Sequence, residues 1–367
     1  MLILAGFTLV FVSLLVLIGL FRITFFWIDH RKAVQVIWPT VSILVAARDE
    51  EVLLPRLLQS LERLDYPNEL LTFYLIDDQS GDGTGLIITD WCSNHQNRKS
   101  FKSKLAPEDS SYKNGKAAAL DSICAQANGE FLFFTDADCK VNSKWIKEGL
   151  SCFDSDTGIV IGVTKVQATS VFGKFQELEW WNALTQVKIA ADLGLQTTGL
   201  GNNMIIRKIA YDKSGGFGMT TKSLTEDLEI SRLIHQTGFK FVHQISPQIL
   251  SFTKEESGLV SLMNQRKRWL SGVLTLPVPW LMLLNLQFLF LPAVFLISYY
   301  IPWLGILLFL IKAATQGVQL ILVSSRVDQK INWLYVLFFD FYSFLINVLT
   351  ILYYIYPSKI RWKSRSY

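Results

Sequence analysis

The chain has 367 residues, of which 50% are hydrophobic and 13% aromatic, and its mean hydropathy is +0.30. That composition excludes an ordinary water-soluble enzyme, because the apolar excess is gathered in long stretches near the two ends of the chain. The net charge of +4 comes largely from basic residues beside those stretches, which fits contact with anionic lipid and gives no reason to expect a nucleic acid partner.

Residues 1–25 are predicted to form an N-terminal transmembrane anchor. The stretch from Met1 to Phe21 carries no charged side chain and is about as long as a bilayer requires. It lacks the positively charged start and the cleavage site of a secretory signal, so we expect it to be retained. Arg22, Arg31 and Lys32 follow it, and the positive-inside rule then places the next part of the chain on the cytoplasmic side.

The middle of the chain, residues 39–252, is predicted to be an α/β domain. Short apolar strands are expected at Val41–Ala46, Phe73–Ile76 and Phe131–Phe134. Between them, residues 50–63 and 116–127 have helical spacing of apolar side chains. Strands that alternate with helices are typical of a mainly parallel sheet flanked by helices.

Two acidic residues, Asp77 and Asp78, follow the second predicted strand directly. Carboxylates at the carboxyl end of a strand in an open α/β sheet lie where such sheets bind ligands, and they can hydrogen-bond a base or a ribose. A plain solvated turn is the alternative interpretation.

Lys116 stands at the start of the next predicted helix, after Gly115. A lysine is unfavourable there for the helix dipole, but becomes favourable when a phosphate binds at the helix start. A basic surface turn is the alternative.

The third predicted strand ends in Asp136-Ala137-Asp138. Two carboxylates so close together repel each other and favour a bound cation. Mg²⁺ and Mn²⁺ prefer oxygen ligands and are commonly shared with substrate phosphates. The pair therefore predicts a metal that binds a diphosphate, with a strand followed by an acidic turn as the alternative.

Two further motifs follow. Thr225-Glu226-Asp227 is an acidic cluster that also suits the first turn of a helix, with Thr225 as its N-cap. Residues 255–280 are predicted to form interfacial helices that carry Gln265, Arg268 and Trp269. Basic residues beside a tryptophan can also serve only as a membrane-surface anchor.

Residues 281–356 are predicted to be a C-terminal transmembrane region, followed by a basic tail at 357–367. Three complete spans there would place the tail outside, against the positive-inside rule, so we expect one segment to be re-entrant or interfacial. Lys312 and Asp340 lie within the apolar stretches. Ionisable residues in spans favour a transporter, which is the alternative from a different functional class.

Taken in this order, the motifs resemble the membrane-bound family 2 glycosyltransferases, which include cellulose, chitin and hyaluronan synthases, ceramide glucosyltransferase and bacterial lipid and carotenoid glycosyltransferases. The Gln-x-x-Arg-Trp element at 265–269 is the most specific of them. The Trp362-Lys363-Ser364-Arg365 segment is similar to the Trp-Lys-Gly-Arg tail of several bacterial members, with serine in place of glycine. Asp49 stands where the family usually has Asn-Glu-Glu, so its role is open.

The resemblance implies a GT-A fold, a nucleotide-sugar donor, by analogy a uridine diphosphate hexose, and a divalent metal, Mg²⁺ or Mn²⁺. It also implies a role for each matching residue. The nucleoside would be contacted by Asp77 and Asp78, and the diphosphate by Lys116. The metal would be bound by Asp138 with Asp136, and the catalytic residues would be Glu226 and Asp227, with Asp227 as the general base. The donor site would be closed by Gln265, Arg268 and Trp269, and the acceptor would be faced by Gly201, Asn202 and Asn203.

The function predicted on this basis is inverting transfer of a sugar to a lipid or another membrane-associated acceptor. We expect the enzyme in a bacterial inner membrane, with its catalytic domain cytoplasmic. A processive polysaccharide synthase with the same site is the main alternative, although few spans remain to enclose a polymer channel. A transporter or scaffold without catalytic activity is the second.

Overall fold

The computed structural model describes residues 1–32, 37–103, 114–195, 197–220, 223–357, 359, 361–363 and 365–366. The chain forms two compact units that interleave along the sequence, where consecutive domains were predicted. The α/β unit comprises Asp29–Gln167, Ala190–Lys254 and Arg361–Tyr367. The helical unit comprises Met1–Ile28, Ala168–Ile189 and Glu255–Ile360.

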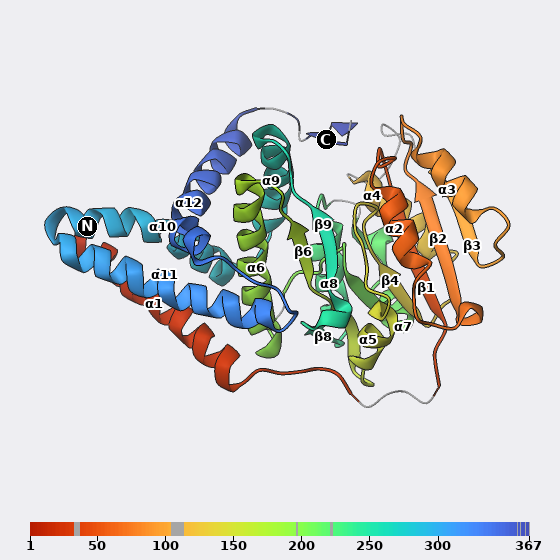
Figure 1. Ribbon diagram of the computed structural model, residues 1–367, viewed down its shortest axis with the longest axis horizontal. Coiled ribbons are helices and arrows are strands. Elements are labelled where there is room, and N and C mark those ends of the chain that lie inside the picture. Colours follow the sequence, from red (N-terminus) through yellow and green to blue (C-terminus); the bar gives the residue numbers. More distant parts are fainter. Residues whose placement is uncertain are drawn as a thin grey trace. The chain divides into compact units, whose positions relative to one another are not determined.

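A seven-stranded sheet of order β3-β2-β1-β4-β7-β5-β8 forms the centre of the α/β unit (Figure 1). Four of its neighbouring pairs are parallel, while β7 runs antiparallel to both β4 and β5, so the predicted mixed, mainly parallel sheet is confirmed. The strands are β1 Val41–Ala47, β2 Leu71–Asp77, β3 Arg98–Lys102, β4 Phe131–Phe134, β5 Thr157–Ile161, β7 Met204–Arg207 and β8 Lys240–His243.

The central strands are buried on both faces because helices cover them, and this is why they read as continuous apolar runs. All four residues of β4 are buried, as are six of the seven in β1. The helices of this unit are α2 Leu54–Leu61, α3 Thr84–Cys92, α4 Gly115–Cys124, α5 Trp145–Ser151, α7 Lys208–Lys213 and α8 Glu226–Gln236.

Short elements complete the α/β unit. Strands β6 and β9 form a separate parallel pair, and the tail forms a two-stranded antiparallel sheet. Their bounds and those of the 3₁₀ helices are β6 Thr164–Gln167, β9 Ser251–Lys254, β10 Arg361–Trp362, β11 Arg365–Ser366, η1 Asn68–Leu70, η2 Phe217–Thr220 and η3 Pro247–Ile249.

The helix expected over residues 50–63 is shorter than predicted. It begins at Leu54, with Pro55 in its first turn, where the missing N–H of proline has no cost. The residues before it are held by another loop instead, since the backbone N–H of Glu50 donates to Thr84 Oγ1 at 2.8 Å. Residues 51–53 form a turn, in which the N–H groups of Leu53 and Leu54 donate to the carbonyl oxygen of Glu50 at 3.1 and 2.9 Å.

The helical unit contains four helices that are long and apolar enough to cross a membrane, as predicted from hydropathy. Two further helices, α6 and α9, complete it among the described residues, apart from the last turn of α6. Their bounds are α1 Leu2–Phe25, α6 Val171–Asp192, α9 Leu259–Val273, α10 Val278–Tyr300, α11 Pro302–Ser325 and α12 Trp333–Ile355.

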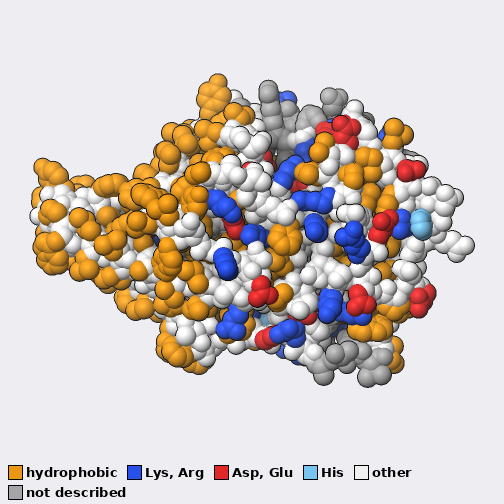
Figure 2. Space-filling model, in the orientation of Figure 1, with side chains coloured by type: hydrophobic (Ala, Val, Ile, Leu, Met, Phe, Trp, Pro, Cys, Tyr) orange, Lys and Arg blue, Asp and Glu red, His pale blue; other side chains and the backbone are white. Residues whose placement is uncertain are grey.

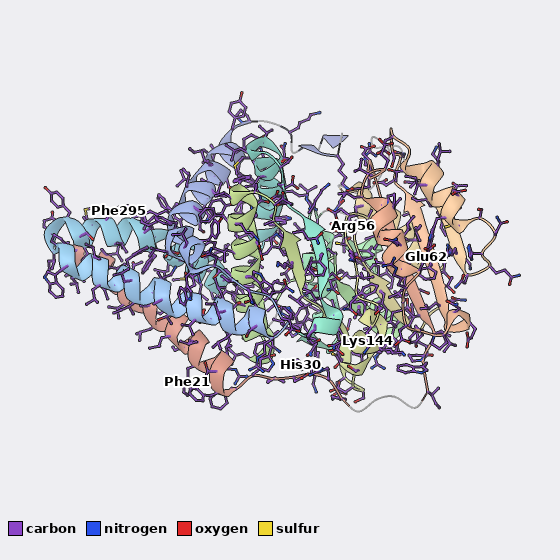
Figure 3. The ribbon with its side chains drawn as sticks, viewed as in Figure 1. Phe21, His30, Arg56, Glu62, Lys144 and Phe295 are labelled. Atoms are coloured by element: carbon purple, nitrogen blue, oxygen red, sulfur yellow. The ribbon has the colours of Figure 1, made fainter. Side chains whose placement is uncertain are left out.

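Helices α1, α10 and α11 pack side by side, and α12 runs across their direction and packs against α9 (Figure 1). Leu9 of α1 and Phe290 of α10 belong to one buried apolar cluster. Other apolar side chains face outward, among them Phe21 at 54% exposed and Phe295 at 58% (Figure 3). Figure 2 shows apolar side chains over these helices, as a lipid-facing surface requires.

Lys312 and Asp340, which lie within the spans, form an ion pair with each other. Lys312 Nζ of α11 contacts Asp340 Oδ1 of α12 and donates to Gln316 Oε1 at 2.7 Å. Gln316 Nε2 in turn donates to Asn182 Oδ1 of α6 at 2.8 Å. Charges inside a membrane are costly unless paired, and this network satisfies them while it links three helices of the unit.

Candidate functional site

The carboxyl ends of three neighbouring parallel strands form the edge of the sheet on which the candidate site is built. In the register, Ala47 of β1 is opposite Asp77 of β2, and Leu44 of β1 is opposite Phe134 of β4. The polar segments that follow these strands therefore emerge at one edge, as is usual for ligand sites in open α/β sheets.

The loops after β1 and β2 hold each other through backbone and carboxylate groups. Asp49 Oδ1 accepts from the N–H of Gly81 at 2.8 Å, and Glu51 Oε2 accepts from the N–H of Gly83 at 2.8 Å. Asp49 itself has φ of 49°, a left-handed conformation that aspartate tolerates better than most residues. The open question about Asp49 thus has a structural answer, since its side chain fixes the shape of the neighbouring loop.

Asp77 and Asp78 are both buried at this edge, at 6% and 2% exposed. Asp77 Oδ1 accepts from the N–H of Ser80 at 2.9 Å and so closes the turn that follows β2. The carbonyl oxygen of Asp78 accepts from Arg48 Nη1 at 2.7 Å. Asp77 therefore orders the loop that presents Asp78.

Lys116 joins three distant segments of the α/β unit. Its Nζ lies 2.5 Å from Asp136 Oδ1 and 3.1 Å from Glu226 Oε1. Glu226 is also held by Asn114, whose Nδ2 donates to Glu226 Oε2 at 2.5 Å. Asn114 Oδ1 caps α4 by accepting from the N–H of Lys116 at 3.0 Å. The lysine thus lies at a helix start, as predicted, but its partners are carboxylates.

Burial opposes the positive charge of Lys116, yet its pKa is raised above the ordinary value. The carboxylates of Asp136, Glu226 and Asp227 are the cause, because together they stabilise the ammonium by more than burial destabilises it. Lys116 is consequently a fixed positive charge at neutral pH, which suits contact with a phosphate.

Asp136 and Asp138 are half-buried directly after β4. Arg56 of α2 (Figure 3) donates from Nη2 to the carbonyl oxygen of Asp138 at 2.5 Å, which fixes the backbone there. Among the described residues no group of three His, Cys, Asp or Glu side chains is placed to hold a metal ion. Two carboxylates nonetheless fit Mg²⁺ or Mn²⁺ in nucleotide sites, where one or two carboxylates act together with substrate phosphates.

The antiparallel direction of β7 brings a second loop to the same edge. Met204 pairs with Phe134, so the residues before β7 face those after β4. The carbonyl oxygen of Asn202 accepts from Thr135 Oγ1 at 3.2 Å. This loop was predicted to face the acceptor, and it does lie beside the segment that carries Asp136 and Asp138.

Asn203 is fully buried and holds the loop from within. Its Oδ1 accepts from Trp145 Nε1 at 2.9 Å, and its Nδ2 donates to the carbonyl oxygens of Val163 and Ile249 at 3.0 and 2.8 Å. These bonds use its amide in the core, so any contact with an acceptor would have to come from Gly201 or Asn202.

Asp227 lies in the first turn of α8, beside Gly201. Its Oδ2 accepts from the N–H of Gly201 at 3.1 Å, and its Oδ1 accepts from the N–H of Leu228 at 2.9 Å. A Cβ built on Gly201 would be 3.5 Å from Lys116 Nζ and 3.6 Å from Asp227 Oδ2. A cation and a carboxylate thus flank one point on the acceptor-side loop.

Gln265, Arg268 and Trp269 lie on α9 of the helical unit. Gln265 Nε2 donates to Glu256 Oε1 at 3.1 Å, and the Trp269 ring packs edge-on against Trp180 of α6 with 5.8 Å between centroids. Each motif residue is partly exposed. The motif is therefore presented by a helix that is braced within its own unit.

The basic tail contributes a residue to the α/β unit. Lys363 forms an ion pair with Glu50 in the loop after β1, and its carbonyl oxygen accepts from Arg48 Nε at 2.8 Å. Ser364, where the tail departs from the family pattern, lies outside the described residues. Burial raises the pKa of Glu50, while the Lys363 ammonium acts in the opposite direction.

Four structural contributors to the site were missed by the sequence analysis, namely Arg48, Glu50, Asn114 and Gly199. Gly199 leaves no room for a side chain, because a Cβ there would be 2.6 Å from the Asp227 carbonyl oxygen. Asn114 carried a usable signal, since an asparagine just before a predicted helix is a common N-cap. Arg48 and Glu50 had no such local signal.

Comparison with known proteins decides the family. The sequence model of glycosyl transferase family 21 matches residues 7–367, which is nearly the whole chain. The chain belongs to this family. The family lies within the family 2 class that the motifs predicted, so that prediction is confirmed for this glycosyltransferase.

Several bacterial proteins are similar to this glycosyltransferase in sequence. The β-monoglucosyldiacylglycerol synthase of Trichormus variabilis is 27% identical over 66% of this chain and 51% of its own length. The probable glycosyltransferase YdaM of Bacillus subtilis is 27% identical over 67% and 57%. The poly-β-1,6-N-acetyl-D-glucosamine synthase of Staphylococcus epidermidis is 27% identical over 63% and 54%. The chain thus spans about half the length of these relatives.

A solved structure supports the fold. A mannosyltransferase from Pyrobaculum calidifontis, determined in complex with GDP-Man and Mn²⁺, superposes with a TM-score of 0.61 over 96% of this chain and 94% of that one. Its sequence identity is 14%, so the likeness concerns the architecture. The GT-A fold predicted from the motifs is confirmed.

Proposed function

We propose that the enzyme transfers one sugar, with inversion, from a nucleoside diphosphate donor to a hydroxyl group of a lipid at the membrane surface. The observation that carries this proposal is the placement of Lys116 and Asp227 next to Gly201, at 3.5 and 3.6 Å from the position that its Cβ would take. Sugar transfer needs a cation for the leaving phosphate and a base for the attacking hydroxyl, and this arrangement offers both at one point.

In this proposal Asp227 is the general base. Its two oxygens are oriented by backbone N–H groups, and its place in the first turn of α8 favours negative charge. Lys116 stabilises the charge that develops on the leaving diphosphate. Glu226 and Asn114 are positioning residues, because both are buried and hold Lys116 in place. Asp78 contacts the nucleoside from the loop that Asp77 orders.

The donor set after β4 fits a divalent ion. Asp138 would hold it, with Asp136 assisting, and the ion would add positive charge at the diphosphate when bound. Asp136 is paired with Lys116, so donor binding would share Lys116 between Asp136 and phosphate oxygens. The positively charged ammonium of Lys116 would then still have negatively charged partners.

A lipid acceptor is supported by the four apolar helices and by the relatives that glucosylate diacylglycerol. Arg22 in the last turn of α1 and Arg31 and Lys32 after it support a cytoplasmic location of the α/β unit. Gln265, Arg268 and Trp269 of α9 would help to bind the donor.

The tail constrains how many helices cross the bilayer. Lys363 packs on Glu50 within the α/β unit, so the chain leaves and re-enters that unit on one side of the membrane. Residues 255–360 must then cross an even number of times. One of the three long helices α10, α11 and α12 would then be re-entrant or interfacial.

The test uses the full chain in membranes that are supplied with radiolabelled uridine and guanosine diphosphate sugars, followed by extraction into organic solvent. We expect label in the organic phase as a product with one added sugar, lost in Asp138→Ala and lost on chelation until Mg²⁺ or Mn²⁺ is restored. A ladder of long water-soluble products would instead favour the polysaccharide synthase. Folded protein that transfers no sugar from any donor would overturn the proposal.

A further inference from the structure

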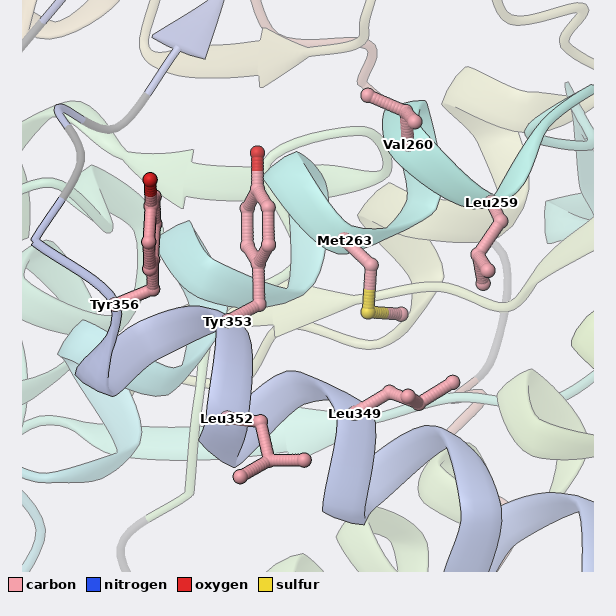
Figure 4. Close-up of a pocket in the computed structure, with 7 residues that line it drawn as sticks. All are labelled: Leu259, Val260, Met263, Leu349, Leu352, Tyr353 and Tyr356. Atoms are coloured by element: carbon pink, nitrogen blue, oxygen red, sulfur yellow. The ribbon is translucent and has the colours of Figure 1, made fainter.

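A groove of about 380 Å³ lies between α9 and α12 of the helical unit (Figure 4). Leu259, Val260 and Met263 line it from α9, and one face of α12 lines it from Leu349 to Tyr356. Its volume is in the range of small-molecule sites. Figure 4 shows Met263 and Leu349 directed toward the space between the two helices.

The lining selects for hydrocarbon. Apart from the two tyrosine hydroxyls its side chains are apolar, and the hydroxyl of Tyr353 already bonds Asn264 Oδ1 at 3.0 Å. A peptide in this groove would leave its backbone polar groups without partners, at a cost that an alkyl chain does not incur. Val260 and Leu352 are 70% and 60% exposed, so the groove opens outward.

The groove shares its helix with the Gln-x-x-Arg-Trp motif. Met263 lines the groove and Gln265 begins the motif two residues later. Lys267, within the motif, donates from Nζ to the carbonyl oxygen of Tyr356 at 3.1 Å and lies 5.3 Å from the Tyr353 ring centroid. Motif and groove are thus parts of one rigid pairing of α9 with α12.

We propose that this groove binds one acyl chain of the lipid acceptor and thereby places the acceptor's hydroxyl beside the motif. The inference rests on the proposed function for the identity of the acceptor. A lipid held here has its chain among apolar side chains and its polar end at the tyrosine end of α12, next to the basic residues of α9. A bulk phospholipid would bind the groove as well as the acceptor does only if the polar end of the acceptor made no contribution to binding.

The test compares two substitutions of the same type on the same helix. Leu352→Trp fills the groove, while Leu345→Trp lies two turns earlier on a surface that is 57% exposed and outside the groove. Each displaced methylene weakens chain binding by about a factor of four. We expect Leu352→Trp to raise KM for a diacylglycerol with long chains at least about tenfold, with little change for a short-chain diacylglycerol, and Leu345→Trp to leave both unchanged.

Binding is measured separately from turnover with a diacylglycerol that carries a diazirine in one acyl chain. In purified full chain we expect crosslinks at the groove residues, reduced by unlabelled diacylglycerol and by Leu352→Trp but not by Leu345→Trp. Crosslinks confined to α1, α10 and α11 would overturn the proposal, as would equal labelling by a diazirine phosphatidylcholine that diacylglycerol does not displace. Because crosslinking needs no sugar transfer, a failed activity assay alone would count against the proposed function and not against the groove.

Discussion

Two buried lysines, one in each unit, show how differently the two regions use an ion pair. Lys312 and Asp340 in the spans are 8% and 12% exposed, and Lys312 also donates to the amide of Gln316 on its own helix. Lys116 is 12% exposed but shares its charge between buried Glu226 and Asp136, whose side chain is 33% exposed. Both members of the first pair are largely shielded from solvent, whereas Asp136 of the second pair opens toward solvent.

We infer from this difference in exposure that the first ion pair has a structural role and the second a chemical one. A closed pair specifies how helices pack, because breaking it leaves a charge in hydrocarbon. An open pair can exchange one carboxylate for a phosphate without losing its charge balance, and this is what a donor site requires. Both lysines lie in apolar stretches of sequence or beside them, so only their surroundings distinguish them. The following predictions test that contrast.

The largest expected effect concerns Asp227. Asp227→Asn keeps the size of the side chain but replaces one acceptor oxygen by an NH₂ group and cannot take a proton, so we expect kcat to fall by about 10²–10⁴-fold with the fold retained. The measurement is initial rate of sugar transfer, with circular dichroism as a check of folding. Glu229→Gln on the same helix is the matched control, because Glu229 pairs with Arg232 on the helix surface. Equal activity of both variants would remove Asp227 from the mechanism.

Removing the charge of Lys116 is expected to have the next largest effect. Lys116→Met should lower kcat by about 10²–10³-fold, the typical cost of losing one preorganised stabiliser of developing charge. It should also weaken donor binding measured by calorimetry, since two buried carboxylates then face the phosphate. Lys144→Met, an exposed lysine at the start of α5 (Figure 3), should change neither quantity. Unchanged donor affinity in Lys116→Met would show that the Lys116–Asp136 pair, like the Lys312–Asp340 pair, does not exchange a carboxylate for a phosphate.

In the spans the prediction is about stability and not about rate. Lys312→Met leaves Asp340 buried and unpaired, so the free energy of unfolding should fall by about 3–5 kcal/mol. The double variant Lys312→Met/Asp340→Leu removes both charges and should recover most of that loss. Thermal unfolding in detergent or nanodiscs measures both. Sugar transfer that disappears in a well-folded double variant would mean that the pair has a chemical role after all.

The smallest effect is expected at the tail. Because burial raises the pKa of Glu50, the folded chain binds its proton more tightly than the unfolded chain does. Stability from this group is then greatest below its unfolded pKa and declines as pH rises through the folded value. Glu50→Gln should flatten that decline between about pH 4 and 7, a change of about 1 kcal/mol or less.

Lys363→Met provides the contrasting variant. It removes the ion pair and leaves the buried carboxylate, so the pKa of Glu50 should rise further and stability at pH 7 should fall more than in Glu50→Gln. Unfolding midpoints across this pH range compare the two. Identical pH profiles for both variants and the parent chain would show that the tail does not pack on Glu50 in solution.

The sequence alone determined the features that depend on local pattern. Apolar runs located β1, β2, β4 and the four long helices, because burial and bilayer thickness act on consecutive residues. Strand ends located Asp77, Asp78, Asp136 and Asp138, because ligand sites recur at that edge of such sheets. The order of the motifs predicted the class of enzyme, which the family match confirmed.

Only the tertiary structure decided which distant side chains meet. Lys116 with Glu226, Lys363 with Glu50 and Lys312 with Asp340 are pairs whose members lie far apart in the chain. No periodicity encodes them, because they follow from strand order, from the reversal of β7 and from how helices pack. The groove between α9 and α12 arises in the same way, because it depends on how these two helices pack together and not on the sequence of either helix alone.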